Sequence, residues 1–389
     1  MTTTARSRPA LRFDRNEFAG AFGDIGTDFP LIAGLILVAD LDATSVLIMF
    51  GAMQLVTGLV YRIPMPVQPL KAMAALMIAQ GLGGDVLYGA GLAIGVMMLL
   101  LSSTGLLERI ARVVPRAVIR GLQFGLGLQL GLLALQEYVP ADGRTGYVLA
   151  GVGFLVVLLL AGNRRYPAAL IVILIGLAYA IAFRFDAAGF GDGVGLNLPG
   201  LHVPEWSEVA RGFFLLAIPQ IPLSLGNSLL ATTQLANDLF PEHRISITKI
   251  GLTYSAMNLV NPFFGGVPTC HGSGGLAGHY YFGARTGGSV VIEGALYIVL
   301  GLLAGTGFAE IVELFPLPVL GVILAFEALA LMRLLGDVAG TPNDLAIALV
   351  VGLVAAGLPY GYAIGLVVGC VLYYGRRWFS VVEDRFRKD

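Results

Sequence analysis

The chain has 389 residues, of which 57% are hydrophobic and only 13% are charged, and its mean hydropathy is +0.81. A soluble domain carries about 25% charged residues, so this composition excludes a soluble globular protein and indicates a polytopic membrane protein. The net charge of −1 gives no sign of a nucleic-acid partner, and the two cysteines, Cys270 and Cys370, imply no disulfide framework. The polar, basic N-terminus lacks a signal-peptide pattern.

Runs of apolar residues predict an all-α fold of fourteen membrane segments, since a spanning helix needs about 20 such residues and fewer inside a bundle. The predicted segments are 17–39, 44–61, 68–82, 85–106, 116–136, 146–162, 167–184, 209–235, 246–262, 269–282, 287–307, 311–332, 343–358 and 361–376. The third and tenth are too short to cross, because fourteen residues reach about 21 Å of a roughly 30 Å core.

The basic residues support this count. With the N-terminus inside, twenty arginines and lysines fall on the cytoplasmic side and only Arg144, Arg184 and Arg211 fall outside, a strong positive-inside bias. Both terminal tails, 1–16 and 377–389, are then expected in the cytoplasm. Seven segments precede the polar loop 185–207 and seven follow it, so the repeat 208–376 is expected to be inverted relative to the repeat 17–184.

Each half contains one proline-rich stretch, Pro64–Lys71 and Val267–Gly275, followed by a short apolar helix. Broken helices at matching places in two halves are the best sequence indication of a transporter's substrate site. The half-helices are expected to begin near Pro69 and Thr269, with Pro69 in the first turn. Two helix N-termini meeting in mid-membrane would form an anion site without charged side chains. The candidate binding residues are Gln68, Pro69, Leu70, Lys71, Gln220, Asn227, Thr269, Cys270, His271 and Gly272.

Several of these residues have structural alternatives. Lys71, the one basic residue placed inside the membrane, either contacts the anion or pairs with Asp24 or Asp28. The amides of Gln68 and Gln220 and the ring of His271 either bind ligand or support broken backbone, and Cys270 suits packing better than reactivity. Four acidic residues are expected to serve proton coupling or structural ion pairs: Asp24, Asp28, Glu293 and Glu327.

Four motifs, Gly23–Thr27, Ile63–Lys71, Pro219–Leu223 and Pro268–Gly278, together resemble the molybdate transporter family, a branch of the sulfate permease superfamily. The resemblance implies a uracil-permease-like fold, with a core domain of segments 1–4 and 8–11 and a gate domain of segments 5–7 and 12–14. It also implies molybdate as substrate, a homodimer, and a location in the inner or plasma membrane. Sulfate permeases usually add a soluble regulatory domain at the C-terminus, which is not expected after this last segment.

The function predicted is secondary active import of a tetrahedral oxyanion, molybdate first, through an elevator-type or rocking movement of the core domain. Entry of a dianion against the membrane potential costs about 4.6 kcal/mol per 100 mV. The sequence has no P-loop, so ATP is not expected to drive this import. Proton symport is therefore expected to supply the compensating positive charge. The alternatives are a transporter of sulfate or another anion, a passive anion channel and, on the same fold, a nucleobase permease. A membrane enzyme is disfavoured because HExxH and GxSxG are missing, and neither a cofactor nor a metal is expected.

Overall fold

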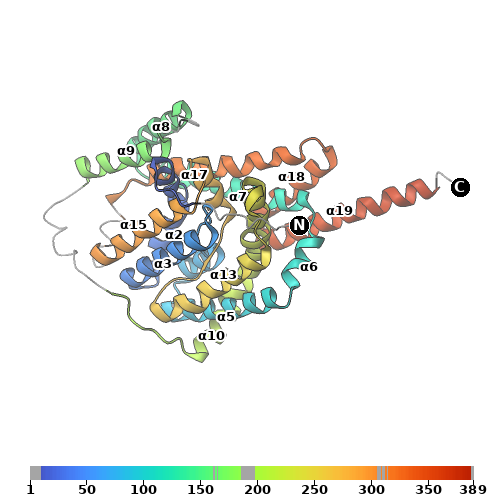
Figure 1. Ribbon diagram of the computed structural model, residues 1–389, viewed down its shortest axis with the longest axis horizontal. Helices are drawn as coiled ribbons and strands as arrows, with labels where there is room; N and C mark the ends of the chain where they lie inside the picture. Colours follow the sequence, from blue (N-terminus) through green and yellow to red (C-terminus); the bar gives the residue numbers. More distant parts are fainter. Residues whose placement is uncertain are drawn as a thin grey trace, which may run out of the picture.

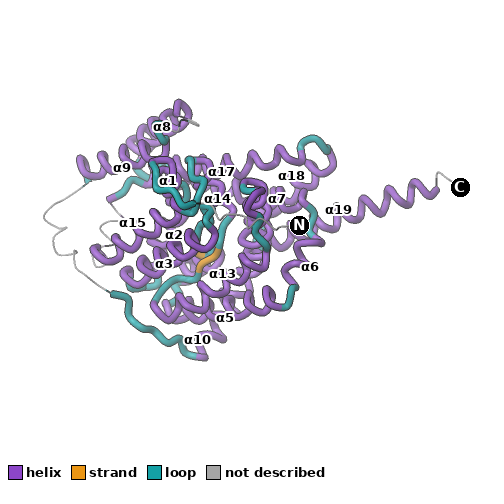
Figure 2. Tube along the Cα trace, viewed as in Figure 1, coloured by secondary structure: helices purple, strands orange, loops and turns teal. Residues whose placement is uncertain are grey.

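The computed structural model describes residues 10–160, 163, 165–184, 198–304, 308, 312 and 314–386, apart from the side chains of 78, 79 and 377–386. The described chain is almost wholly helical (Figures 1 and 2). In the first half the helices are α1 (Arg15–Ala21), α2 (Ile25–Val38), α3 (Ala43–Tyr61), α4 (Lys71–Gln80), α5 (Gly84–Ser103), α6 (Leu106–Val113), α7 (Arg116–Leu133), α8 (Gly143–Leu160) and α9 (Ala168–Phe183). In the second half they are α10 (Trp206–Gly212), α11 (Ile218–Leu223), α12 (Thr232–Leu239), α13 (Ile247–Val260), α14 (Ser273–Tyr281), α15 (Gly288–Ala304), α17 (Leu317–Met332), α18 (Pro342–Gly357) and α19 (Gly361–Phe386).

Every predicted segment overlaps at least one of these helices. Among the described residues, six helices are long and apolar enough to cross a membrane, and a seventh span results if α1 and α2, bent by 42°, count as one. Three further apolar helices are shorter, at Ala168–Phe183, Gly288–Leu303 and Pro342–Gly357. The protein is therefore a multi-pass helical membrane protein, and the full count of fourteen spans stays a prediction.

The two half-helices begin later than predicted. Gln68–Pro69 form strand β1 and Thr269–Cys270 form strand β2, so α4 begins at Lys71 and α14 at Ser273. The expectation that Pro69 belongs to the first helical turn is therefore wrong. The residue before a proline is pushed towards extended backbone, which explains why Gln68 pairs with a strand and does not start a helix.

Segment eight and the C-terminal tail also differ from expectation. Helical structure is continuous from Trp206 to Leu239, beyond both ends of the predicted segment 209–235 and through Pro219 and Pro222. Wider π-helical turns at Phe213–Ala217 and Ser224–Ala231 lie on either side of the prolines and accommodate the distortion that the prolines cause in the helix. At the other end, α19 runs through most of the predicted tail 377–389 because no Gly or Pro follows Gly375 (Figure 1). Most of the predicted loop 185–207 lies outside the described residues.

Helices from the two halves of the chain pack against each other. α3 packs on α15, α5 on α13, and α7 on α17 and α18. Small residues allow this close approach: a Cβ at Gly51 would lie only 2.4 Å from the carbonyl oxygen of Gly294. The halves are thus interleaved around a shared core.

The strands β1 and β2 join the two broken stretches. They are antiparallel and buried, with Gln68 opposite Cys270 and Pro69 opposite Thr269, and they lie among the helices in the middle of the molecule (Figure 2). The N–H of Leu70 adds a hydrogen bond of 3.1 Å to the carbonyl of Pro268. This ladder fixes the starts of α4 and α14 relative to each other.

Candidate functional site

The start of α4 receives a cap from a distant part of the chain. Its own N-cap residue, Leu70, has no side chain that can accept the free N–H groups. Instead Oε1 of Gln220, on α11, accepts hydrogen bonds from the backbone of Ala72 at 2.9 Å and of Met73 at 3.2 Å. The same amide donates through Nε2 to Ser224 at 3.1 Å. Gln220 therefore lies where the first turn of α4 presents its positive potential.

The start of α14 is built from glycines and has no side-chain cap. A Cβ at Gly272 would lie 1.5 Å from Oε1 of Gln68, and a Cβ at Gly275 would lie 1.9 Å from Oδ2 of Asp24. Only glycine permits this approach. Beside them, Ser273 donates through its hydroxyl to Oδ1 of Asn227 at 2.7 Å. The first turn of α14 is thus in close contact with polar groups from three other segments, those of Gln68, Asp24 and Asn227.

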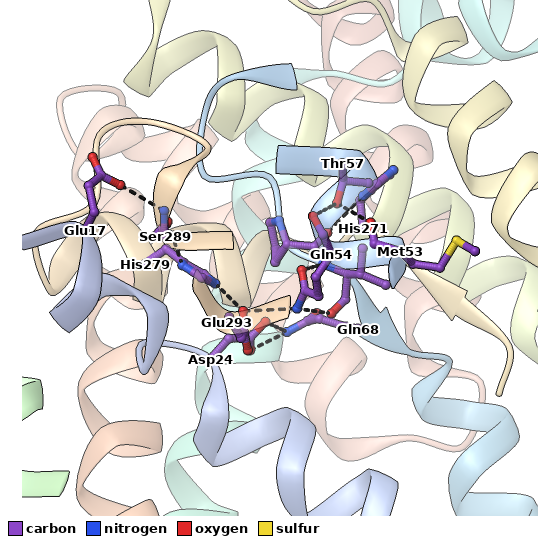
Figure 3. A network of polar contacts seen from close by, with 12 residues as sticks. Glu17, Asp24, Met53, Gln54, Thr57, Gln68, His271, His279, Ser289 and Glu293 are labelled. Carbon is purple, nitrogen blue, oxygen red and sulfur yellow. Dashed lines mark hydrogen bonds and ion pairs between the residues drawn. The ribbon is translucent and has the colours of Figure 1, made fainter. Parts of the chain in front are cut away.

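Charged groups gather here with few partners. Gln68 donates through Nε2 to both carboxylate oxygens of Asp24 (Figure 3). Thr27 donates to Oε2 of Glu327 at 3.0 Å. Among the described residues, Nζ of Lys71, both oxygens of Asp28 and Oε1 of Glu327 are buried without a hydrogen-bond partner. The ion pair considered for Lys71 with Asp24 or Asp28 is not found within the described part of the chain.

His271 and Thr269 hold the broken backbone in this structure. The ring of His271 contacts the carbonyl of Pro66 through Nδ1 at 2.9 Å and the hydroxyl of Thr253 through Nε2 at 2.7 Å. The backbone of Thr269 exchanges two hydrogen bonds with the amide of Asn258, at 3.0 and 2.6 Å. Both ring nitrogens of His271 are therefore already engaged, and these polar groups brace the ladder.

A second buried network surrounds Glu293 (Figure 3). Oε2 of Glu293 accepts from Nε2 of Gln54 at 3.0 Å and lies 3.3 Å from Nε2 of His279. Gln54 also exchanges two hydrogen bonds with the backbone of Val67, at 2.9 and 3.1 Å, and so connects Glu293 to the first broken stretch. Gln54, Thr27 and His279 were missed by sequence reasoning. The signal that could have found them is a polar side chain within an otherwise apolar helix.

The structure brings most predicted site residues to one place. Around the two helix starts lie Asp24, Gln68, Pro69, Leu70, Lys71, Gln220, Asn227, Thr269, Cys270, His271, Gly272 and Glu327. Cys270 is buried with a free thiol. Within the described residues, no group of three His, Cys, Asp or Glu side chains could hold a metal ion. Among the described residues, this arrangement places backbone N–H groups and the ammonium of Lys71, which has no hydrogen-bond partner, beside several buried carboxylates.

Solved transporter structures share this fold. The transmembrane domain of a cyanobacterial bicarbonate transporter, BicA, matches with a TM-score of 0.59 and 15% identity over 92% of this chain and 99% of that domain. The murine solute carrier 26 family member A9 anion transporter, in the inward-facing state, matches with a TM-score of 0.62 and 13% identity over 95% of this chain and 69% of that one. At such low identities these likenesses establish the fold alone.

Sequence comparison identifies the family. The profile described as "molybdate transporter of MFS superfamily" matches residues 16–130 and 212–331. Molybdate transporter 2 of Arabidopsis thaliana is 34% identical, with 87% of this chain and 82% of that protein aligned. Molybdate transporter 1 of the same plant is 33% identical over 88% and 84%. Molybdate transporter 1 of Chlamydomonas reinhardtii is 27% identical over 88% of each chain. The resemblance found in the motifs is thereby confirmed, and the chain belongs to the molybdate transporter family.

Proposed function

We propose that this chain is a secondary active transporter that imports a tetrahedral oxyanion, with molybdate as the first candidate. The relatives that carry the name molybdate transporter support the substrate, and solved anion transporters of the same fold support the class. The observation that carries the proposal is the ladder β1–β2, which places the starts of α4 and α14 together beside the unpaired ammonium of Lys71. No enzymatic step is part of the proposal.

The anion is held mainly by backbone N–H groups in the first turns of α4 and α14; at α4, Gln220 releases the N–H groups of Ala72 and Met73, which it caps in this structure, when the anion binds. Each helix start supplies about half a positive charge, and Lys71 adds a full one. Gln68, Gln220 and Asn227 assist with polar side chains that already surround these turns, and Thr269 assists through the backbone that Asn258 holds. The remaining predicted members contribute backbone groups and support: Pro69, Leu70, Cys270, His271 and Gly272.

Protons accompany the anion. Four buried carboxylates, Asp24, Asp28, Glu293 and Glu327, lie near one buried ammonium, that of Lys71. A dianion added to this cluster would leave several negative charges uncompensated in a water-poor site, which is very costly. Protonation of carboxylates as the dianion enters removes that cost and also offsets the membrane potential. We therefore assign the coupling to protons.

The inverted architecture belongs to the same proposal. Aligning Pro66 with Pro268 makes Gln68 the counterpart of Cys270, and these two residues pair directly in the antiparallel ladder. A two-fold axis through that pair would relate the repeats 17–184 and 208–376, with the loop 185–207 between them and the tails 1–16 and 377–389 in the cytoplasm. In this arrangement fourteen spans form a core domain and a gate domain, and the core moves by an elevator or rocking motion.

We also propose a homodimer in the inner or plasma membrane, joined through gate-domain helices. Helix α8, in the predicted gate domain, has only 22% of its apolar window buried, against 50–61% for the other five clear spans. Of these six spans, α8 therefore leaves the largest share of its apolar window exposed, where lipid or a second copy of the chain can contact it. Mass measurement in lipid nanodiscs would test this; monomers alone would exclude the dimer without affecting the transport proposal.

A binding screen of the purified chain tests the function. We expect molybdate and tungstate to bind, with sulfate weaker, and bicarbonate and uracil not to bind. Vesicles loaded at higher internal pH should then accumulate molybdate above the external concentration. Tight binding of sulfate or uracil in place of molybdate would overturn the substrate. Single-channel currents with no gradient-driven accumulation would indicate a passive channel.

A further inference from the structure

A buried histidine and a buried glutamate face each other next to the proposed anion site. His279, on α14, is 0% exposed and Glu293, on α15, is 3% exposed. Their Nε2 and Oε2 atoms lie 3.3 Å apart, and neither Nε2 of His279 nor Oε1 of Glu293 has a hydrogen-bond partner among the described residues. A neutral imidazole and a carboxylate at this distance can share one additional proton.

The pair is linked to the anion site on one side. Gln54 bridges Glu293 to the backbone of Val67, directly before the ladder. Other titratable groups interact electrostatically with the pair: Asp24, Asp28, Glu327 and Tyr297 act on Glu293, and Asp24 and Glu17 act on His279. Lys71, on α4, acts on Asp24, Asp28 and Glu327. Because Lys71 is the one buried ammonium in this set, the pair lies in surroundings that favour keeping a proton.

On the other side the pair leads towards the surface. Nδ1 of His279 lies 3.2 Å from the hydroxyl of Ser289, and the backbone N–H of Ser289 donates to Glu17 at 3.2 Å (Figure 3). Glu17 follows Asn16, which lines a cavity of ≈ 280 Å³ together with Asn163 and Arg285. In the proposed topology this end faces the cytoplasm. Oε1 of Glu17 also accepts from the backbone N–H of Arg285, which lines this cavity, so the contacts extend from the anion site to a polar cavity on that side. Because the backbone N–H of Ser289 holds Glu17 but cannot relay a proton, a proton that leaves His279 through the Ser289 hydroxyl reaches Glu17 by way of water.

We propose that the His279–Glu293 pair holds a proton that is carried with the anion and released past Ser289 and Glu17 on the cytoplasmic side. In one state the proton is bonded to Oε2 of Glu293 and the imidazole is neutral. In the other it has moved to Nε2 of His279, which leaves a carboxylate beside an imidazolium. The inference rests on the proposed proton-coupled uptake and assigns that coupling to particular atoms.

The test compares two measurements on the full chain in liposomes. Exchange of labelled molybdate at equal pH needs no net proton movement, whereas accumulation under an imposed pH gradient does. Glu293→Gln resembles the protonated glutamate, and His279→Gln removes the partner that takes up the proton. We expect exchange and molybdate binding to remain near wild type in both variants. Since a factor of ten corresponds to about 1.4 kcal/mol, the accumulation ratio should fall about tenfold per pH unit of gradient when one coupled proton is lost.

Matched controls separate the outcomes. His202→Gln and Glu108→Gln make the same substitutions away from the pair and should leave the accumulation ratio unchanged. If wild type binds molybdate but shows no gradient-driven accumulation, the proposed symport fails before any variant is considered. If wild type accumulates molybdate and both pair variants match it, the inference is overturned and the symport stands. Loss of molybdate binding in Glu293→Gln and His279→Gln would equally overturn it, since the pair would then serve binding or folding.

Discussion

Gln68 donates hydrogen bonds from its single amide nitrogen to both carboxylate oxygens of Asp24. Nε2 lies 2.6 Å from Oδ1 and 2.8 Å from Oδ2. Both residues are fully buried. The other end of the amide, Oε1, faces Gly272 at the start of α14. One side chain therefore connects the first broken stretch, the second broken stretch and the first segment.

Gln68→Ala should weaken molybdate binding by roughly ten- to a hundredfold, because a hydrogen bond to a charged group contributes about 1.5–3 kcal/mol. Isothermal titration calorimetry measures the change. The matched control is Gln234→Ala, which removes an amide contact of 2.9 Å to Asp238 away from the site. Unchanged affinity in folded Gln68→Ala would place the anion elsewhere.

Gly275→Ala should abolish detectable molybdate binding. Its Cβ would lie 1.9 Å from Oδ2 of Asp24 and 3.0 Å from Nε2 of Gln68, so the pair must separate or α14 must shift. Overpacking of this kind typically costs about 1–3 kcal/mol, which a thermal unfolding curve would register. Gly336→Ala, with nothing within 4 Å of the added Cβ, should change neither property. Normal binding by Gly275→Ala would contradict the described geometry of the α14 start.

Lys71→Met tests the unpaired ammonium, since it removes the charge and keeps an apolar side chain of similar length. If Lys71 faces the anion, affinity for molybdate should fall about tenfold or more, and affinity for perrhenate, a tetrahedral monoanion, should fall less. Because no carboxylate pairs with Nζ among the described residues, adding Asp28→Asn should not restore protein yield. Recovery of yield in that double variant would instead reveal a structural ion pair.

Arg120→Met should destabilise the protein far more than Arg116→Met, although both arginines lie on α7 one turn apart. Both contact Asp238 and Asp337, but the Arg120 side chain is 0% exposed and that of Arg116 is 53% exposed. Removing one partner of a fully buried pair costs about 3–5 kcal/mol and an exposed pair contributes about 0–1 kcal/mol. Because Asp238 and Asp337 are 26% and 39% exposed, water can solvate the carboxylates left behind, and the loss in Arg120→Met should lie between these two ranges. Thermal unfolding in one detergent compares the two variants. Equal losses would show that the burial of Arg120 does not matter.

The sequence predicted the meeting of the two broken stretches better than it predicted their local backbone. Proline and glycine mark irregular backbone whatever its final form, so the meeting of the stretches around Gln68 and Cys270 could be anticipated. The antiparallel ladder between them could not, because its hydrogen bonds join residues some two hundred positions apart. For the same reason α4 and α14 begin three to four residues later than expected. Continuous helix through Pro219 and Pro222 depends on π-helical turns that have no sequence signature.

Side-chain partners were the least predictable part. The sequence leaves two partners open for Lys71, an anion or a carboxylate. Only the packing of the fold determines which groups lie within reach of its ammonium. The sequence marks His279 only as a polar side chain within an apolar helix, and its contact with Glu293 on the next helix becomes visible only in the folded structure. Gln220 was identified from its place beside prolines, yet its contact with the N–H groups of Ala72 and Met73 requires the folded arrangement of α4 and α11.

The glycine-rich start of α14 has a consequence for how this transporter can diversify. In the site we propose, the attraction for negative charge comes from backbone N–H groups, which every residue except proline carries, so it is kept by any substitution that leaves the backbone of this turn in place. Side chains around the helix starts, such as Asn227 and Ser273, are free to change size and hydrogen-bonding character without removing that attraction. New preferences among oxyanions can therefore arise by a few substitutions on an unaltered scaffold, while glycines 272 and 275 stay fixed because no other residue fits.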